Sequence, residues 1–178
     1  MTHRKAVFTA LVFSASALML QTRADSEPVR QAPSVRAAAL YAPDYTRGSE
    51  GVWGFELGYA SPNFPFENMS FSWGHISSND IQHNYFLLNF EDSYPLPIEN
   101  LSLVGGSGLG VILADEDPGP DTNSALGRLS VGFRYDACSA VSLFADVNFL
   151  IAYDDVFLDG RSHDNKTWQY LIGLTYRF

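Results

Sequence analysis

Tyr170-Leu-Ile-Gly-Leu-Thr-Tyr-Arg-Phe178, the last nine residues of this 178-residue chain, alternate between two kinds of side chain. Every second residue is apolar or aromatic, whereas the residues between them are mostly small or polar. Successive side chains of a β-strand point to opposite faces, so this pattern predicts a strand with one continuous apolar face. The apolar set is Tyr170, Ile172, Leu174, Tyr176 and Phe178, and the other set is Leu171, Gly173, Thr175 and Arg177.

The same alternation recurs upstream and divides most of the chain into similar segments. A single bacterial chain that closes into a membrane barrel has an even number of strands. The pattern marks seven, so we expect an eighth, weakly patterned strand at Val35–Tyr45. The seven are Val52–Ala60, Glu67–Ile76, Ile81–Phe90, Leu101–Leu113, Leu126–Asp136, Val141–Tyr153 and Thr167–Phe178.

These segments predict an all-β fold, a single eight-stranded antiparallel up-and-down transmembrane β-barrel over residues 35–178. Its apolar faces would lie in lipid and its small and polar faces would line the interior. The four glycines of Leu101–Leu113 further predict a tightly curved strand or one with a bulge.

The amino end has the pattern of a secretory signal. Arg4 and Lys5 precede an uncharged run from Ala6 to Leu20, which is too short to span a bilayer comfortably, and small residues follow at Thr22 and Ala24. We therefore expect residues 1–24 to be a removed signal peptide and residues 25–34 to be a periplasmic segment before the barrel.

Composition limits the partners of the chain. It carries 20 Asp and Glu against 11 Lys and Arg, for a net charge of −9, and the predicted signal removes cations but no acids. Such a chain is a poor match for nucleic acid, since phosphate binding needs clustered Lys and Arg. Cys138 is the single cysteine, so no internal disulfide can form.

The predicted interior carries charges of both signs. The expected polar network of the lumen consists of Glu56, Arg128, Arg134, Asp146 and Arg177. An eight-stranded barrel is just wide enough for side chains to fill it, which favours an ion-paired plug over a narrow polar pore. The connections Ala114–Ala125 and Asp154–Lys166 would lie outside the cell. Both are acidic, and divalent cations would be able to bridge their carboxylates to lipid phosphates.

The overall plan resembles that of small outer-membrane barrels of the OmpA-like and OmpW-like type. The ending also resembles the signal that such barrels present to their assembly machinery, with Gly173, Tyr176 and Phe178 at the matching positions. The resemblance implies a bacterial outer-membrane location, with membrane lipid or lipopolysaccharide and the barrel-assembly machinery as partners. It implies no cofactor, no metal and a structural or surface-interaction role.

Two alternative functions stay open. The plan is also similar to that of the PagL-type lipid A deacylases, which carry a His-x-Ser pair and a Glu near the external ends of the last two strands. The corresponding stretches Asn148–Tyr153 and Lys166–Gln169 contain neither. Gly51-Val-Trp53 matches the G-x-W opening of the lipocalins, which are soluble carriers with an apolar interior.

Two smaller clusters invite a chemical interpretation. Ser162-His163-Asp164 has the residue types of a hydrolytic triad, although three consecutive residues do not converge on one reacting atom. His75 and His83 flank a short predicted turn and would be able to meet across a hairpin as metal ligands or a base. Surface positions are the more economical interpretation of both clusters, since a metal site normally needs three or four ligands.

Overall fold

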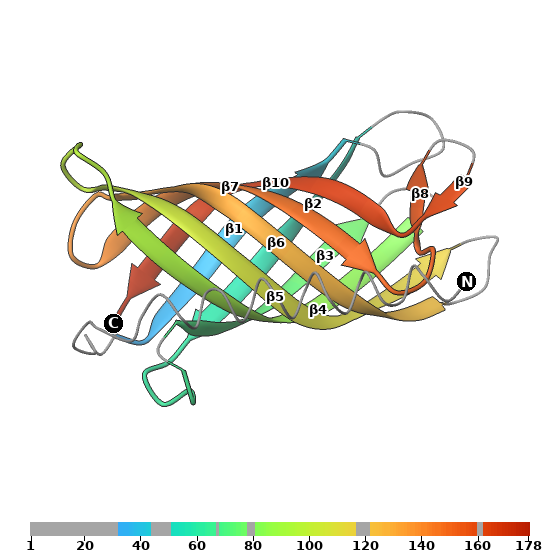
Figure 1. Cartoon of the computed structure of the whole chain (residues 1–178), viewed down its shortest axis with the longest axis horizontal. Helices are drawn as coiled ribbons and strands as arrows, with labels where there is room; N and C mark the ends of the chain where they lie inside the picture. The colour runs from blue at the N-terminus through green and yellow to red at the C-terminus, as the bar shows by residue number, and fades with distance from the viewer. Residues whose placement is uncertain (1–31, 44–50, 67, 78–80, 117–121, 160–161) are drawn as a thin grey trace.

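The chain forms one closed antiparallel barrel (Figure 1). The computed structural model describes residues 32–43, 51–66, 68–77, 81–116, 122–159 and 162–178, so the predicted signal peptide and most of the 25–34 segment lie outside the described residues. Within the described residues the barrel strands are β1 Ser34–Ala42, β2 Val52–Ala60, β3 Met69–Ser77, β4 Ile81–Pro95, β5 Leu101–Glu116, β6 Thr122–Asp136, β7 Val141–Ala152 and β10 Lys166–Arg177.

Closure occurs between the first and last strands. Each strand pairs with its neighbours in sequence, and β1 pairs with β10 from Ser34↔Arg177 to Tyr41↔Tyr170. The eight-stranded barrel is therefore confirmed, including the weakly patterned first strand. We call the end where β1 begins and β10 finishes the terminal end, and the opposite end the loop end.

Several predicted strand boundaries are wrong, and of the two alternatives for the glycine-rich strand the structure excludes the bulge. At the loop end, β5 continues to Glu116 and β6 already begins at Thr122. β4 continues to Pro95, so its connection to β5 at the terminal end shrinks to the turn 96–100. Asn100 takes a left-handed φ of 62° there, a conformation that Asn tolerates. β5 pairs with β4 without interruption, from Ile81↔Glu116 to Pro95↔Ser102, so its glycines mark no bulge.

The glycines of β5 instead leave room for interior side chains. A Cβ atom at Gly108 would lie 2.5 Å from Oδ1 of Asn89, which points inward from β4. Gly108 therefore leaves the space that the buried Asn89 amide occupies, and a larger residue at this position would clash with that amide.

A hairpin at the loop end was not predicted. Between β7 and β10, β8 (Phe157–Asp159) pairs with β9 (Ser162–Asp164) as a separate two-stranded sheet, at the opposite end of the barrel from the C-terminus (Figure 1). Backbone bonds fix its base to the barrel: Ala152 N donates to Asn165 O at 2.7 Å, and Tyr153 N donates to Ala125 O at 2.9 Å.

The outer wall of the barrel is apolar. Large side chains on the outward face of every barrel strand are exposed, and Trp53 and Ile172 reach 66% and 67%. Soluble monomers rarely expose apolar patches beyond a few hundred Å², whereas a membrane barrel needs such a band around its whole circumference. Outward residues that contribute include Val35, Phe55, Phe71, Leu88, Val111, Val131, Phe133, Leu143, Tyr170 and Leu174.

The described residues contain no helix that is long and apolar enough to cross a membrane.

The interior divides into two halves. Inward side chains near the loop end are mostly apolar and fully buried, whereas those near the terminal end are mostly polar or charged. The apolar half includes Leu40, Ala42, Ile76, Leu87, Ile112, Ala114, Leu126, Leu150 and Ala152. The inward positions of a lipocalin would be apolar throughout and its outer wall polar, so the lipocalin alternative does not fit. Trp53 of the G-x-W match faces outward.

Candidate functional site

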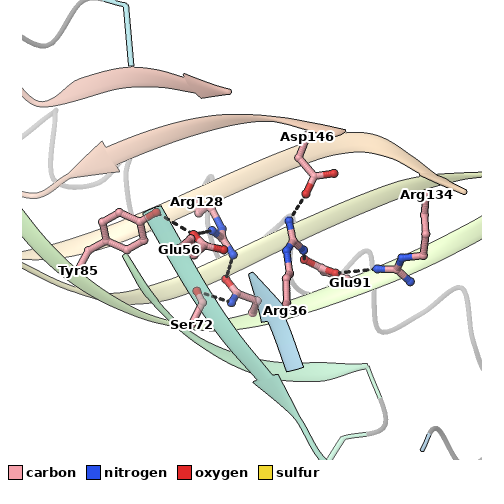
Figure 2. Close-up of polar contacts among 9 residues, drawn as sticks. Arg36, Glu56, Ser72, Tyr85, Glu91, Arg128, Arg134 and Asp146 are labelled. Carbon is pink, nitrogen blue, oxygen red and sulfur yellow. Dashed lines mark hydrogen bonds and ion pairs between the residues drawn. The ribbon is translucent and has the colours of Figure 1, made fainter. Parts of the chain in front are cut away.

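The deepest charged group of the interior centres on Glu56 of β2, which is fully buried. Arg128 of β6 donates from Nη1 to Glu56 Oε2 at 2.6 Å, and the Tyr85 hydroxyl donates to the same oxygen at 2.7 Å. Arg128 Nη2 also donates to Asn89 Oδ1 at 2.5 Å, and Asn89 Nδ2 donates to Ser72 Oγ at 3.0 Å. Figure 2 shows this group, which ties together four strands and satisfies a charge that would be costly to bury alone.

A second charged group lies nearer the terminal end and centres on Arg36 of β1. Its guanidinium donates to Glu91 at 2.9 Å and also pairs with Asp146, while Arg134 donates from Nη2 to the other Glu91 oxygen at 3.3 Å (Figure 2). The Arg36 guanidinium also lies over the Phe144 ring, 3.7 Å from its centroid, where a cation–π attraction adds to the ion pairs.

A third group stands at the terminal rim. Arg177 Nη2 donates to Asp136 Oδ1 at 2.8 Å and to Ser142 Oγ at 2.6 Å. The Arg177 and Asp136 side chains are partly exposed, so their ion pair should contribute less to stability than the two deeper groups. A polar cavity of about 580 Å³ occupies the terminal half of the interior, and members of all three groups line it, including Glu56, Arg36 and Asp136.

The five residues of the expected polar network all face the interior, but the structure distributes them over these three groups. Glu56 and Arg128 pair directly, Arg134 and Asp146 belong to the Arg36 group, and Arg177 stands at the rim. β2 and β6 are not neighbours in the barrel, so the Glu56–Arg128 pair crosses the lumen rather than joining adjacent strands. Arg36, Tyr85, Asn89 and Glu91 are central members that sequence reasoning missed.

The two histidines do not form a site. In register, His75 pairs with Asn84 and Ile76 pairs with His83, so His75 and His83 occupy opposite faces of the wall. His83 is fully buried inside, whereas His75 is on the outward face and contacts Asn84 Oδ1 through Nδ1 at 3.0 Å. A meeting across the hairpin is therefore excluded, and the favoured interpretation as surface residues is wrong for His83. Over the part of the chain that the structure describes, no three His, Cys, Asp or Glu side chains are grouped to hold a metal ion.

The stretches that correspond to the deacylase catalytic positions alternate between the two faces of the wall, and their inward polar residues are two amides and Thr167. Asn148 and Gln169 pair in register on β7 and β10 and are 1% and 0% exposed. Ser162-His163-Asp164 forms the short strand β9 of the loop-end hairpin.

At the loop end, residues 154–157 form a strap that leads into the hairpin and includes the first residue of β8. Val156 and Phe157 are each 1% exposed, and the Phe157 ring lies over His83 with their centroids 6.5 Å apart. The backbone N of Asp154 donates to Ser124 Oγ at 2.9 Å and holds the start of the strap to β6. The strap therefore packs on the apolar half of the interior.

Gly173, which belongs to the expected assembly signal, also allows close packing between β10 and β1. A Cβ atom there would lie 2.7 Å from Ala38 Cα and 2.8 Å from Cζ of Phe144, at the seam where β10 meets β1. Tyr176 and Phe178 face outward at the terminal end, their ring centroids 5.2 Å apart.

We expect Gly173→Ala to impair closure of the seam, because overpacking a tight site costs about 1–3 kcal/mol. The free energy of unfolding, measured by urea titration after refolding into detergent micelles, should fall by that amount. Gly58→Ala is the matched control, since the nearest atom to its added Cβ is 3.3 Å away. If Gly173→Ala is as stable as the wild-type chain in this purified system, then Gly173 is not needed to close the seam, and only its role in the assembly signal would remain.

A closed antiparallel barrel with an apolar outer wall and an ion-paired interior defines the class of transmembrane β-barrels found in bacterial outer membranes. Solved structures share this fold. The chain is similar to Neisserial surface protein A, with a TM-score of 0.57, 16% identity and coverage of 82% of this chain and 97% of that one. It is also similar to outer membrane protein H of Pseudomonas aeruginosa, with a TM-score of 0.56, 15% identity and coverage of 83% and 99%.

The N-terminal β-barrel domain of Pseudomonas aeruginosa OprF gives a TM-score of 0.51 at 17% identity, over 82% of this chain and 97% of that domain. No protein-family model and no curated protein matches the sequence. The predicted fold, a small eight-stranded barrel of the outer-membrane type, is confirmed by this shared fold. One of these neighbours, outer membrane protein H, has in its name the location that the sequence predicts.

Proposed function

We propose that this chain is a non-conducting outer-membrane barrel with a structural or surface-interaction role, which presents its loop end to the cell exterior. The observation that carries the proposal is that the lumen is blocked beyond the terminal-end cavity. Charged side chains pair across the lumen in one half, and apolar side chains fill the other half beneath the Val156–Phe157 strap. A solute would have to displace both.

The orientation follows from the lengths of the connections. Outer-membrane barrels have short periplasmic turns and longer external loops. At the terminal end the turns are short, as at 96–100 and 137–140, whereas the loop end carries the β8–β9 hairpin. The terminal end would therefore face the periplasm, and the cavity near Arg134 would open there.

Lipid headgroups are the proposed partners of the loop end. Asp115, Asp154 and Asp155 are exposed there, and carboxylate oxygens are preferred ligands of divalent cations. Cations held between these carboxylates and the phosphates of lipopolysaccharide would fix the barrel in the outer leaflet. Assembly machinery that reads the strand ending at Phe178 would be the second partner.

Conductance tests the proposal. In planar lipid bilayers the purified full chain should give no stable current steps, because the Glu56–Arg128 pair crosses the lumen and apolar side chains fill its loop-end half. A variant with Val156→Ala and Phe157→Ala loses the strap but keeps the ion pairs, so it should also stay closed. Discrete, reproducible conductance steps from the wild-type chain would contradict the proposal and favour the narrow pore.

A further inference from the structure

Two buried amide side chains stand side by side in the interior, outside the three charged groups. Asn148 on β7 and Gln169 on β10 are directly opposed in register, so their Cβ atoms are about 5 Å apart. Both are at least 99% buried. None of their four side-chain oxygen and nitrogen atoms has a hydrogen-bond partner among the residues that the structure describes.

The surroundings leave these amides few alternatives. Among the neighbouring inward residues on their own strands, Leu150 and Leu171 are buried and apolar. Thr167, also inward, donates its hydroxyl to Trp168 O at 3.4 Å. Arg128 and Asp146 lie close in register, but their charged ends are bonded to Glu56, Asn89 and Arg36. Ser130 of β6 lies opposite Asn148 in register and adds a hydroxyl beside the two amides. None of these three residues lines the terminal-end cavity.

The hydrogen-bonding groups of the two amides indicate which small molecule or ion could satisfy them. Each amide offers two N–H donors and one carbonyl acceptor, and buried polar groups are almost always hydrogen-bonded. A cation would satisfy only the carbonyls and an anion only the N–H groups. Water both donates and accepts, and a buried water typically makes two to four hydrogen bonds to such groups.

We propose that Asn148 and Gln169 form a buried hydration site that holds at least one shared, long-lived water within the barrel wall. The site lies between the ion-paired and the apolar halves, where the interior changes from polar to dry. The shared water bridges the two strands through their side chains, so it depends on both amides at once.

The test is water-to-protein cross-relaxation in NMR spectra of the ¹⁵N-labelled full chain in detergent micelles. The side-chain NH₂ groups of Asn148 and Gln169 should both show cross-peaks to water with the sign of a long-lived complex. The exposed Asn123 provides the surface-hydration reference. Absence of such cross-peaks at both amides, with a direct hydrogen bond between them, would overturn the proposal from the wild-type spectrum alone.

Single replacements test whether the water is shared. Asn148→Leu should abolish the water cross-peak of Gln169 completely, and Gln169→Leu should abolish that of Asn148. Leu171→Met, a matched change at the adjacent inward position, should leave both cross-peaks in place. A Gln169 cross-peak that persists in Asn148→Leu would contradict a shared site.

Discussion

Glu56→Ala is expected to lower the free energy of unfolding by about 3–5 kcal/mol, because it leaves Arg128 as an uncompensated buried charge. Both partners are almost fully buried, with side-chain exposures of 0% and 3%. The same change removes the acceptor of the Tyr85 hydroxyl, which donates to Glu56 at 2.7 Å. Urea titration of the protein in lipid vesicles, followed by the unheated folded band on gels, measures the loss.

A double replacement separates the effect of leaving one buried charge unpaired from the effect of losing side-chain volume. Glu56→Leu with Arg128→Met removes both charges and keeps much of the volume, so its loss should be clearly smaller than that of Glu56→Ala. Arg177→Ala, at the partly exposed rim, should cost at most about 1 kcal/mol. Equal losses for Glu56→Ala and Arg177→Ala would contradict a buried cross-lumen pair.

Arginine on the outer wall should be strongly destabilising in a bilayer. Ile172 and Val131 lie near the middle of β10 and β6, face outward and are 67% and 52% exposed. At the bilayer midplane an arginine on the lipid face costs about 2–4 kcal/mol. On a soluble protein the same exposed substitutions would usually stay within about 0.5 kcal/mol. Unfolding titrations of Ile172→Arg and Val131→Arg in lipid vesicles measure the difference.

Asn123→Arg is the matched control for the wall. Asn123 is exposed at the loop end of β6, far from the middle of the strand, and its replacement should leave the free energy of unfolding nearly unchanged. If Ile172→Arg and Asn123→Arg behave alike in vesicles, then the exposed apolar wall is not embedded in lipid.

Much of the barrel wall is predictable from local pattern, because alternate residues of a strand face opposite sides and the sequence alternates with the same period of two. Trp53, Phe55 and Leu57 alternate with Gly54 and Glu56, and the structure has the same assignment of faces. β1 was recoverable only through the requirement for an even number of strands, since its small residues Ala37 and Ala39 face outward and blur the alternation.

Which charged side chains pair with one another inside the barrel was harder to predict from the sequence. Glu56 and Arg128 meet across the barrel because of the tilt and stagger of the strands, which no single segment encodes. Glu91 was missed because β4 extends beyond the predicted end at Phe90, and Arg36 because its strand was weakly patterned. The strap at Val156–Phe157 was placed in an exposed loop, since only tertiary packing buries those two side chains.

The most direct test of the account is where the mature chain resides and in what form. Cells that express the full chain should be separated into soluble, inner-membrane and outer-membrane fractions, washed with alkaline carbonate and run on gels with and without heating. The account predicts a carbonate-resistant protein in the outer-membrane fraction that migrates faster unheated, as a closed barrel does. Recovery in the soluble periplasm, or a single heat-independent band, would contradict it.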